Sequence, residues 1–275
     1  MGLLGGIGKL GVADALTIGN GLCGAAAIVL LAREGIMYST SPDITLGSAL
    51  ILLGFVLDGA DGWAARRWGT KHGYGRHLDS ISDAFTFCAA PAVMMRVQFR
   101  YATNPVFNTT TNDLFEALLL LTSGAMLVLG WTRLYRFTTK GYKLPHFTGL
   151  ATPAMAFLAI LVCHILGPPR WEGSEGTPAV AAVLIMLAAS LLMVAPVRYP
   201  KLRGRAGIVF AVGVLLGLVS IGAMRASGAE GTSAAFSALS LTALGLVLAY
   251  VLLGPVWMYV AGGRPGEDDW PGRPG

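Results

Sequence analysis

The sequence has few charged residues. Only 13% of its 275 residues are Asp, Glu, Lys or Arg, whereas 54% are hydrophobic and the mean hydropathy is +0.63. A soluble globular chain carries about 25% charged residues, so the composition excludes an ordinary soluble domain and indicates a polytopic membrane protein. The net charge of +5 does not indicate a nucleic-acid partner, because basic residues flank membrane spans.

Cysteine is also scarce. The three cysteines, Cys23, Cys88 and Cys163, lie far apart in apolar segments. An odd number at this spacing argues against a disulfide framework or a zinc site, so we expect buried free thiols. The N-terminus lacks the charged and strongly apolar regions of a cleavable signal peptide, and no internal repeat or soluble domain is visible in the sequence.

Apolar runs of about 20 residues, the length that crosses a bilayer, recur along the chain. They predict an all-α fold, a polytopic transmembrane helical bundle with about eight spans. The bundle is expected to form a single domain over residues 1–261, with its catalytic core at about 10–200, followed by a disordered tail at 262–275. The predicted spans are 14–32, 46–66, 77–97, 114–134, 149–167, 177–196, 206–225 and 235–260.

Lysine and arginine are distributed unevenly between the two sides of this arrangement. Fifteen fall on the side that holds both termini, and five fall on the other side. Because basic residues accumulate in cytoplasmic loops, we expect both termini to be cytoplasmic. The sequence therefore predicts an integral protein of the cell membrane.

Four acidic residues interrupt the second and third predicted spans. Asp58 and Asp61 are three residues apart, and Asp79 and Asp83 are four apart, so each pair lies on one face of a helix. A Gly- and Arg-rich turn at 68–75 can fold the second helix back on the first and bring the four carboxylates together. Carboxylates share a pocket of low dielectric only when they are protonated or neutralised by cations. Oxygen ligands favour Mg²⁺ or Mn²⁺.

This stretch resembles the motif of the CDP-alcohol phosphotransferase superfamily at every fixed position. The matching residues are Asp61, Gly62, Ala65, Arg66, Gly75, Asp79 and Asp83, and Asp58 supplies the leading aspartate. The resemblance implies an enzyme that transfers a phosphatidyl-type group from a CDP-linked lipid to an alcohol and releases CMP.

The resemblance also implies roles for individual residues. The four aspartates would bind two divalent ions, Mg²⁺ or Mn²⁺, and Asp83 would act as general base. The small and basic residues of the motif would contact the nucleotide of the CDP-lipid; these are Gly62, Ala65, Arg66 and Gly75. We further expect an active site that faces the cytoplasm, and a homodimer, which rests on the resemblance alone.

The start of the first predicted span resembles that of the serine-type members, the phosphatidylserine synthases and their archaeal-lipid equivalents. Thr17 and Asn20 match the threonine and asparagine of the family's opening pattern, whereas Ala13 and Asp14 stand where Pro-Asn is usual. The resemblance places Thr17 and Asn20 among the residues that bind the nucleotide or the CDP-lipid. An ordinary polar start of a helix is the other interpretation of these two residues.

Two later stretches also resemble serine-type members. They are R-L-Y-R-F at 133–137 and F-T-G-L-A-T-P-A at 147–154, the latter with Ala151 in place of the usual proline. Arg133 and Arg136 lie on the same side of the membrane as the aspartates, and two forked guanidinium groups suit a phosphate or a carboxylate. We expect them to bind the acceptor or a phosphate, with positive-inside anchoring as the other explanation.

These features favour L-serine as the acceptor. Glycerol 3-phosphate or inositol phosphate is the alternative, because the same arginines suit a second phosphate. Diacyl and isoprenoid ether lipids are not distinguished, since residues that contact lipid tails are generic. An ion-coupled transporter is a different class, which predicts acids near mid-bilayer and matching broken helices. Here the acids lie near one face and no repeat is seen.

Overall fold

The computed structural model describes residues 11–37, 43–68, 75–100, 109–139, 147–167, 177–200, 212–213, 216, 219 and 234–262. Within these ranges the regular structure is helical apart from one short β-ribbon. The predicted all-α membrane fold is therefore confirmed at the level of class.

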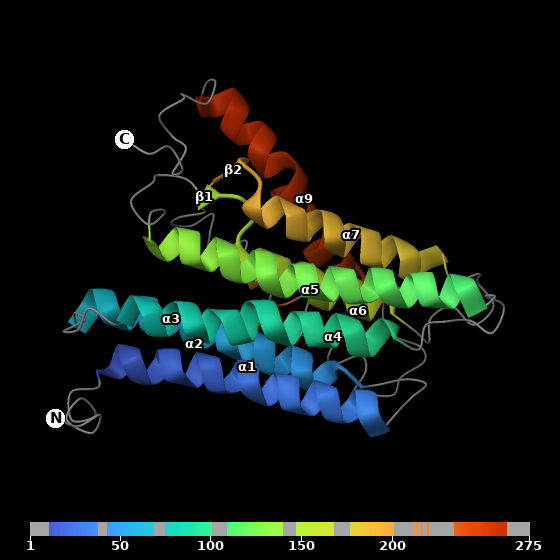
Figure 1. Ribbon diagram of the computed structural model, residues 1–275. Coiled ribbons are helices and arrows are strands. Elements are labelled where there is room, and N and C mark those ends of the chain that lie inside the picture. Colours follow the sequence, from blue (N-terminus) through green and yellow to red (C-terminus); the bar gives the residue numbers. More distant parts are fainter. Residues whose placement is uncertain are drawn as a thin grey trace.

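The helices are α1 (Val12–Met37), α2 (Thr45–Trp68), α3 (Gly75–Asp83), the π-helical η2 (Ala84–Ala89), α4 (Ala90–Phe99), α5 (Thr109–Thr139), α6 (Thr152–Leu166), α7 (Thr177–Val194) and α9 (Ala234–Gly262). Helices α1 and α2 run in opposite directions, α3, η2 and α4 continue one another in the direction of α1, and α5 runs back beside them (Figure 1). We call the end of the bundle where α2 ends and α3 begins the motif end. The start of α1, the end of α5 and the start of α6 lie at the same end (Figure 1).

The helices coincide with most of the predicted spans. Four described segments are long and apolar enough to cross a membrane, namely Val12–Ile36, Thr45–Trp68, Asp113–Thr139 and Thr242–Val260. Helices α6 and α7 are apolar but shorter, and α3, η2 and α4 follow one another without a break over the predicted third span. The seventh predicted span and the tail lie largely outside the described residues. A total of eight spans stays a prediction, as does the orientation of the termini.

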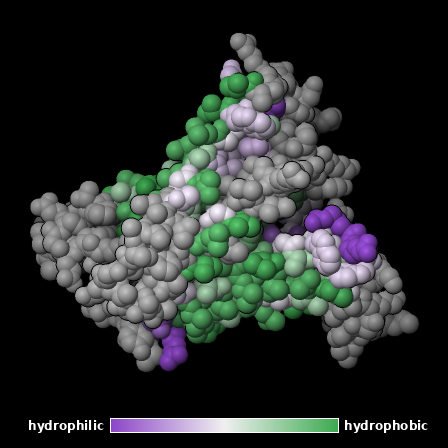
Figure 2. Space-filling view, turned by 180° about the vertical axis from the view of Figure 1, so that it is seen from behind, coloured by the Kyte–Doolittle hydropathy of each residue, from purple (hydrophilic) through white to green (hydrophobic). Residues whose placement is uncertain are grey.

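Large apolar side chains cover the outside of the bundle. In Figure 2 they spread across the middle of the visible face, and hydrophilic side chains lie toward its edges. Among the exposed residues are Leu22 and Val29 of α1, and Leu120, Leu121 and Val128 of α5. Exposed apolar surface of this extent is unfavourable in water and is the expected surface of a helix bundle in lipid.

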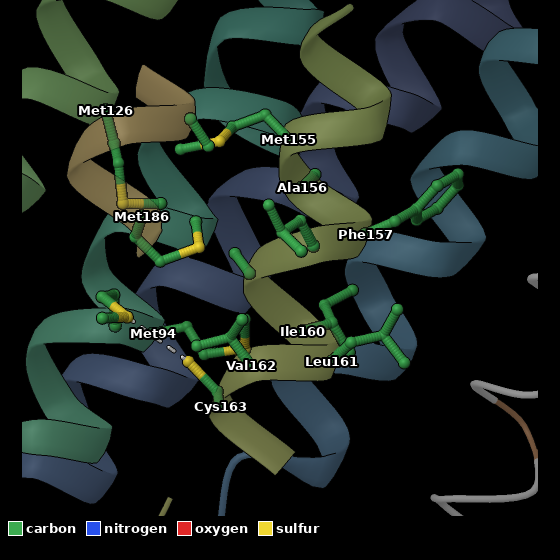
Figure 3. Close-up of a cluster of buried hydrophobic side chains, with 14 of the residues drawn as sticks. Met94, Met126, Met155, Ala156, Phe157, Ile160, Leu161, Val162, Cys163 and Met186 are labelled. Carbon is green, nitrogen blue, oxygen red and sulfur yellow. Dashed lines mark hydrogen bonds between the residues drawn. The ribbon is translucent and has the colours of Figure 1, made fainter. Parts of the chain in front are cut away.

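Helix α6 forms the centre of the core. Every side chain from Ala154 to His164 is buried, which follows from a sequence that is apolar around the whole helix. Met94 of α4, Met126 of α5 and Met186 of α7 pack around it (Figure 3), and their flexible thioethers fill irregular gaps. All three cysteines are free thiols, as expected from their number and spacing.

The start of α6 differs from the predicted span, which began at residue 149. Strand β1 (Phe147–Thr148) precedes α6 and pairs antiparallel with strand β2 (Arg198–Tyr199), which follows α7. Gly149, directly after β1, takes a φ of +79°. Helix α6 begins only at Thr152, and Pro153 occupies its first turn, where no backbone N–H is required. The ribbon therefore ties the start of α6 to the segment that follows α7.

Candidate active site

The structure brings the acidic residues of α2 and α3 together at the motif end. One carboxylate oxygen from each of Asp58, Asp61 and Asp79 lies within 4.8 Å of the others. Asp83 follows one turn after Asp79, close enough for its charge to interact with those of Asp58 and Asp79. The two helices thus fold back on each other as a shared site requires.

This set of ligand atoms suits a hard divalent cation. Oxygen ligands lie about 2.0–2.1 Å from Mg²⁺, so two of them are separated by at most about 4.2 Å, and small side-chain movements would close the observed spacing. Asp61 is buried, and carboxylates this close repel one another unless positive charge lies between them. Within the described part of the chain, no other group of three acidic, histidine or cysteine side chains has this spacing.

Helix α1 donates hydrogen bonds to two of the aspartates. Thr17 Oγ1 donates to Asp61 Oδ2 at 2.5 Å, and Asn20 Nδ2 donates to Asp83 Oδ1 at 3.0 Å. Thr17 and Asn20 lie one turn apart on α1, and both side chains are buried. The sequence analysis predicted that these two residues bind the nucleotide; in the structure their polar groups are directed at carboxylates.

A π-helical turn follows Asp83 directly. This turn, η2, joins α3 directly to α4. Such π turns inside helices occur frequently at functional sites. Thr86, within η2, donates from Oγ1 to the main-chain oxygen of Asn20 at 2.8 Å. Sequence analysis missed Thr86, although its position three residues after Asp83 places it near the same helix face. The π turn itself has no compositional signature.

Two glycines allow α1, α2 and η2 to approach one another. A Cβ at Gly24 of α1 would lie 2.5 Å from Thr86 Oγ1 and 2.6 Å from the main-chain nitrogen of Thr86. A Cβ at Gly54 of α2 would lie 2.8 Å from Asn20 Oδ1 and 2.5 Å from Thr86 Cγ2. These separations are much shorter than ordinary contacts between carbon atoms. The packing around Asn20 therefore depends on the absence of a side chain at Gly24 and at Gly54.

The remaining motif residues lie beside the aspartates. On α2, Ala65 is half-buried and Arg66 is exposed, and Arg66 Nη1 would be 3.4 Å from a Cβ at Gly62. Gly75 is the first residue of α3, and a Cβ there would lie 3.8 Å from Asp14 Oδ1. Between these two groups, residues 69–74 lie outside the described part of the chain. Small side chains and one basic side chain thus flank the carboxylate cluster.

The two arginines of α5 have different surroundings. Arg133 is only 6% exposed; its Nη1 donates to Thr152 Oγ1 at 3.2 Å, and its charge interacts with that of Asp83. Arg136 Nη1 instead donates to the main-chain oxygen of Val194 at 3.1 Å. Val194 is the last residue of α7, where carbonyl groups lack helical partners. Arg133 is therefore close enough to interact with the charge of Asp83, whereas Arg136 binds the end of a neighbouring helix.

The fold and the site together define a helical membrane protein with a carboxylate cluster suited to a divalent cation. The chain belongs to the CDP-alcohol phosphatidyltransferase family, whose family model matches residues 10–261. The family membership predicted from the aspartate motif is therefore confirmed.

Three relatives illustrate where the chain falls within the family. It is 30% identical to archaetidylserine synthase of Methanothermobacter thermautotrophicus over 174 residues, which make up 62% of this chain and 64% of that protein. It is 34% identical to CDP-diacylglycerol–serine O-phosphatidyltransferase of Methanocaldococcus jannaschii over 175 residues, 63% of this chain and 73% of the relative. The enzyme of that name from Bacillus subtilis is 27% identical over 191 residues, 70% of this chain and 90% of the relative. The chain thus matches slightly less than two thirds of the length of the first relative.

Proposed function

We propose that this protein transfers a phosphatidyl-type group from a CDP-linked lipid to the hydroxyl of L-serine and releases CMP. The observation that carries this proposal is a buried guanidinium, Arg133, close enough to Asp83 for the two charges to interact. The names of the relatives support it, because archaetidylserine synthase and CDP-diacylglycerol–serine O-phosphatidyltransferase both denote enzymes with a serine acceptor.

In this proposal the carboxylate cluster binds divalent ions. Asp58, Asp61 and Asp79 supply the ligand atoms whose spacing fits such an ion, and Asp83 can share a second one. We propose two ions, Mg²⁺ or Mn²⁺. When bound, they neutralise the diphosphate and stabilise the oxygen that leaves with CMP.

The flanking residues hold the nucleotide in this proposal. Gly62, Ala65 and Gly75 let the nucleotide approach the backbone closely because their side chains are absent or small. Arg66 is exposed beside them and can neutralise phosphate oxygens. The lipid tails remain in the bilayer, because the site lies at the end of the bundle.

Asp83 acts as the general base. Its carboxylate takes the proton from the serine hydroxyl as the serine oxygen forms a bond to the phosphorus atom attached to the lipid. The bond between that phosphorus and the CMP oxygen breaks, and the electron pair leaves with CMP. Arg133 holds the serine carboxylate through its forked donors, which directs the hydroxyl toward Asp83.

The surroundings of the two arginines favour serine over a phosphorylated polyol. Glycerol 3-phosphate and inositol phosphate bring a second phosphate, which suits a denser group of basic side chains. Arg136 contacts the end of α7 through Nη1, whereas the charge of Arg133 interacts with that of Asp83. One guanidinium matches the charge of one carboxylate.

We also propose that the motif end faces the cytoplasm, where CDP-linked precursors and Mg²⁺ are available. The distribution of basic residues supports this orientation, because within the described ranges more of them lie at the motif end than at the opposite end. The motif end has Arg66, Arg67, Arg133, Arg136 and Arg198, and the opposite end has Arg33, Arg96 and Arg100. A homodimer is proposed from the family resemblance alone, and cross-linking in membranes tests it.

The acceptor is tested by offering each candidate to the purified protein. CDP-diacylglycerol and its isoprenoid ether counterpart are each incubated with L-serine, glycerol 3-phosphate or inositol phosphate, and CMP and the lipid product are measured. We expect serine to support CMP release and to appear in the product, with Asp83→Asn as the inactive control. If only a phosphorylated polyol supports CMP release, the serine assignment is wrong and the family assignment stands.

A further inference from the structure

Asn20 is enclosed where α1, α2 and η2 meet. Its side chain is 0% exposed, and its Nδ2 donates to Asp83 Oδ1 at 3.0 Å. The reverse orientation of the amide would place two oxygen atoms at that distance and repel the carboxylate, so the amide nitrogen is the atom that faces Asp83. A fully buried side chain of this kind has no surface to offer to a bound nucleotide.

Both the main chain and the side chain of Asn20 have close contacts. Thr86 Oγ1 donates to its main-chain oxygen at 2.8 Å. Gly54 of α2 leaves room for the amide, since a Cβ there would lie 2.8 Å from Asn20 Oδ1. Close packing at Gly54 and the hydrogen bond from Nδ2 to Asp83 Oδ1 thus restrict the Asn20 amide.

The π turn places both contacts of Asn20 on the same stretch of chain. Asp83 immediately precedes η2 and Thr86 lies within it, so the segment that carries the carboxylate also anchors the asparagine. A rotation of the Asp83 side chain would have to break the hydrogen bond to Asn20. No described group donates a hydrogen bond to Asp83 Oδ2, which leaves that oxygen for a substrate proton.

We propose that Asn20 is a positioning residue for Asp83 and does not contact the nucleotide. It fixes the rotation of the carboxylate so that Oδ2 faces the acceptor hydroxyl. This inference rests on the proposed function, in which Asp83 is the general base. It predicts that loss of Asn20 slows the chemical step and leaves nearly unchanged the binding of CDP-lipid and of the ion held by Asp58, Asp61 and Asp79.

Thr17 provides a matched control on the same helix. It lies one turn before Asn20, is also buried, and donates to Asp61 instead of Asp83. Asp61 belongs to the proposed metal cluster, and loss of a hydrogen bond to a metal ligand typically weakens metal affinity about 10–100-fold. Two neighbouring side chains of α1 are therefore predicted to affect different steps.

The test compares Asn20→Ala with Thr17→Val in the full-length protein in lipid nanodiscs. For Asn20→Ala we expect kcat to fall about 100-fold, the effect of a small misplacement of a reacting group, with the KM for CDP-lipid within about twofold of the original. For Thr17→Val we expect the Mg²⁺ concentration that gives half-maximal activity to rise about 10–100-fold. Thr17→Ser, which keeps the hydroxyl, should restore the original requirement.

A second variant, Thr86→Val, tests the proposal even if Asn20→Ala does not fold. Thr86→Val keeps the asparagine and removes the hydrogen bond that anchors it, so kcat should fall by less than in Asn20→Ala, and Thr86→Ser should restore it. Direct binding of CDP-lipid and thermal unfolding report whether each variant is folded. If Asn20→Ala does not fold, a loss of kcat in Thr86→Val with unchanged KM supports the proposal, and an unchanged kcat overturns it.

The outcomes separate this inference from the proposed function. A raised KM for CDP-lipid with unchanged kcat in Asn20→Ala would show that Asn20 contacts the nucleotide. An unchanged kcat in Asn20→Ala beside an inactive Asp83→Asn would refute only the positioning role. Turnover at the original rate in Asp83→Asn would refute the base assignment, and the positioning role with it.

Discussion

Gly24→Ala is predicted to slow CMP release strongly from a position outside the carboxylate cluster. Gly24 of α1 faces η2, and an added Cβ would lie 2.5 Å from Thr86 Oγ1, 2.6 Å from Thr86 N and 2.7 Å from the carbonyl carbon of Phe85. Two of these atoms belong to the backbone, so rotation of a side chain cannot relieve the overlap. The helices must separate by about 0.9 Å before ordinary contact distances of about 3.5 Å are reached.

That separation is large enough to break the hydrogen bond between Thr86 and the main-chain oxygen of Asn20. The hydrogen bond from Thr86 to the Asn20 main-chain oxygen, now 2.8 Å, would lengthen toward about 3.7 Å, beyond the range of a hydrogen bond. A misplacement of about 1 Å can reduce activity about 100-fold, and overpacking of a core costs about 1–3 kcal/mol of stability. We expect losses of that size in the rate of CMP release and in the free energy of unfolding.

The assay measures the initial rate of CMP release and the unfolding midpoint of purified Gly24→Ala. Gly124→Ala is the control, because a Cβ at Gly124 of α5 would meet nothing within 4 Å. This control should retain the original rate and midpoint. If Gly24→Ala also retains both, α1 and η2 can separate without harm, and close packing at Gly24 is not what holds Asn20 and Asp83 in place.

Three further predictions concern the acceptor, the metal and the orientation. Arg133→Ala should raise the KM for serine and leave the KM for CDP-lipid unchanged, whereas Arg136→Ala should leave the KM for serine near its original value; equal effects of both variants would contradict the assignment of Arg133. EDTA should abolish CMP release and added Mg²⁺ or Mn²⁺ should restore it, and full activity in EDTA would refute the metal site. Cysteines introduced at 102–112 should react with an impermeant reagent in intact cells, while those at 138–146 should require permeabilisation; the reverse pattern would invert the orientation.

The helices and the aspartate pairs were predictable because they follow from local rules. Apolar runs of about 20 residues indicate spans, and acids within such runs are costly enough to indicate function. Spacings of three and four residues place Asp58 with Asp61 and Asp79 with Asp83 on helix faces. Each of these inferences needs only the sequence of one segment and the cost of placing charge in lipid.

The partners of these residues were not predictable, because they depend on how distant segments pack. Asn20 meets Asp83 only because glycines allow α1 to approach η2 closely, and the π turn has no sequence signature. Arg133 and Arg136 look equivalent at a spacing of three residues, yet Arg136 contacts the end of α7. Strands β1 and β2 have two residues each, which is too short for an alternating pattern.

The most direct test of the central claim measures Mn²⁺ binding by electron paramagnetic resonance. It compares the original protein with Asp61→Asn and Asp83→Asn. The structure places Asp61 in the cluster of ligand atoms and places Asp83 against Asn20. We therefore predict that Asp61→Asn loses most Mn²⁺ binding, and that Asp83→Asn keeps at least one bound ion although its turnover is abolished. Mn²⁺ binding by Asp61→Asn with the affinity of the original protein would contradict the claim that this carboxylate cluster is the metal site.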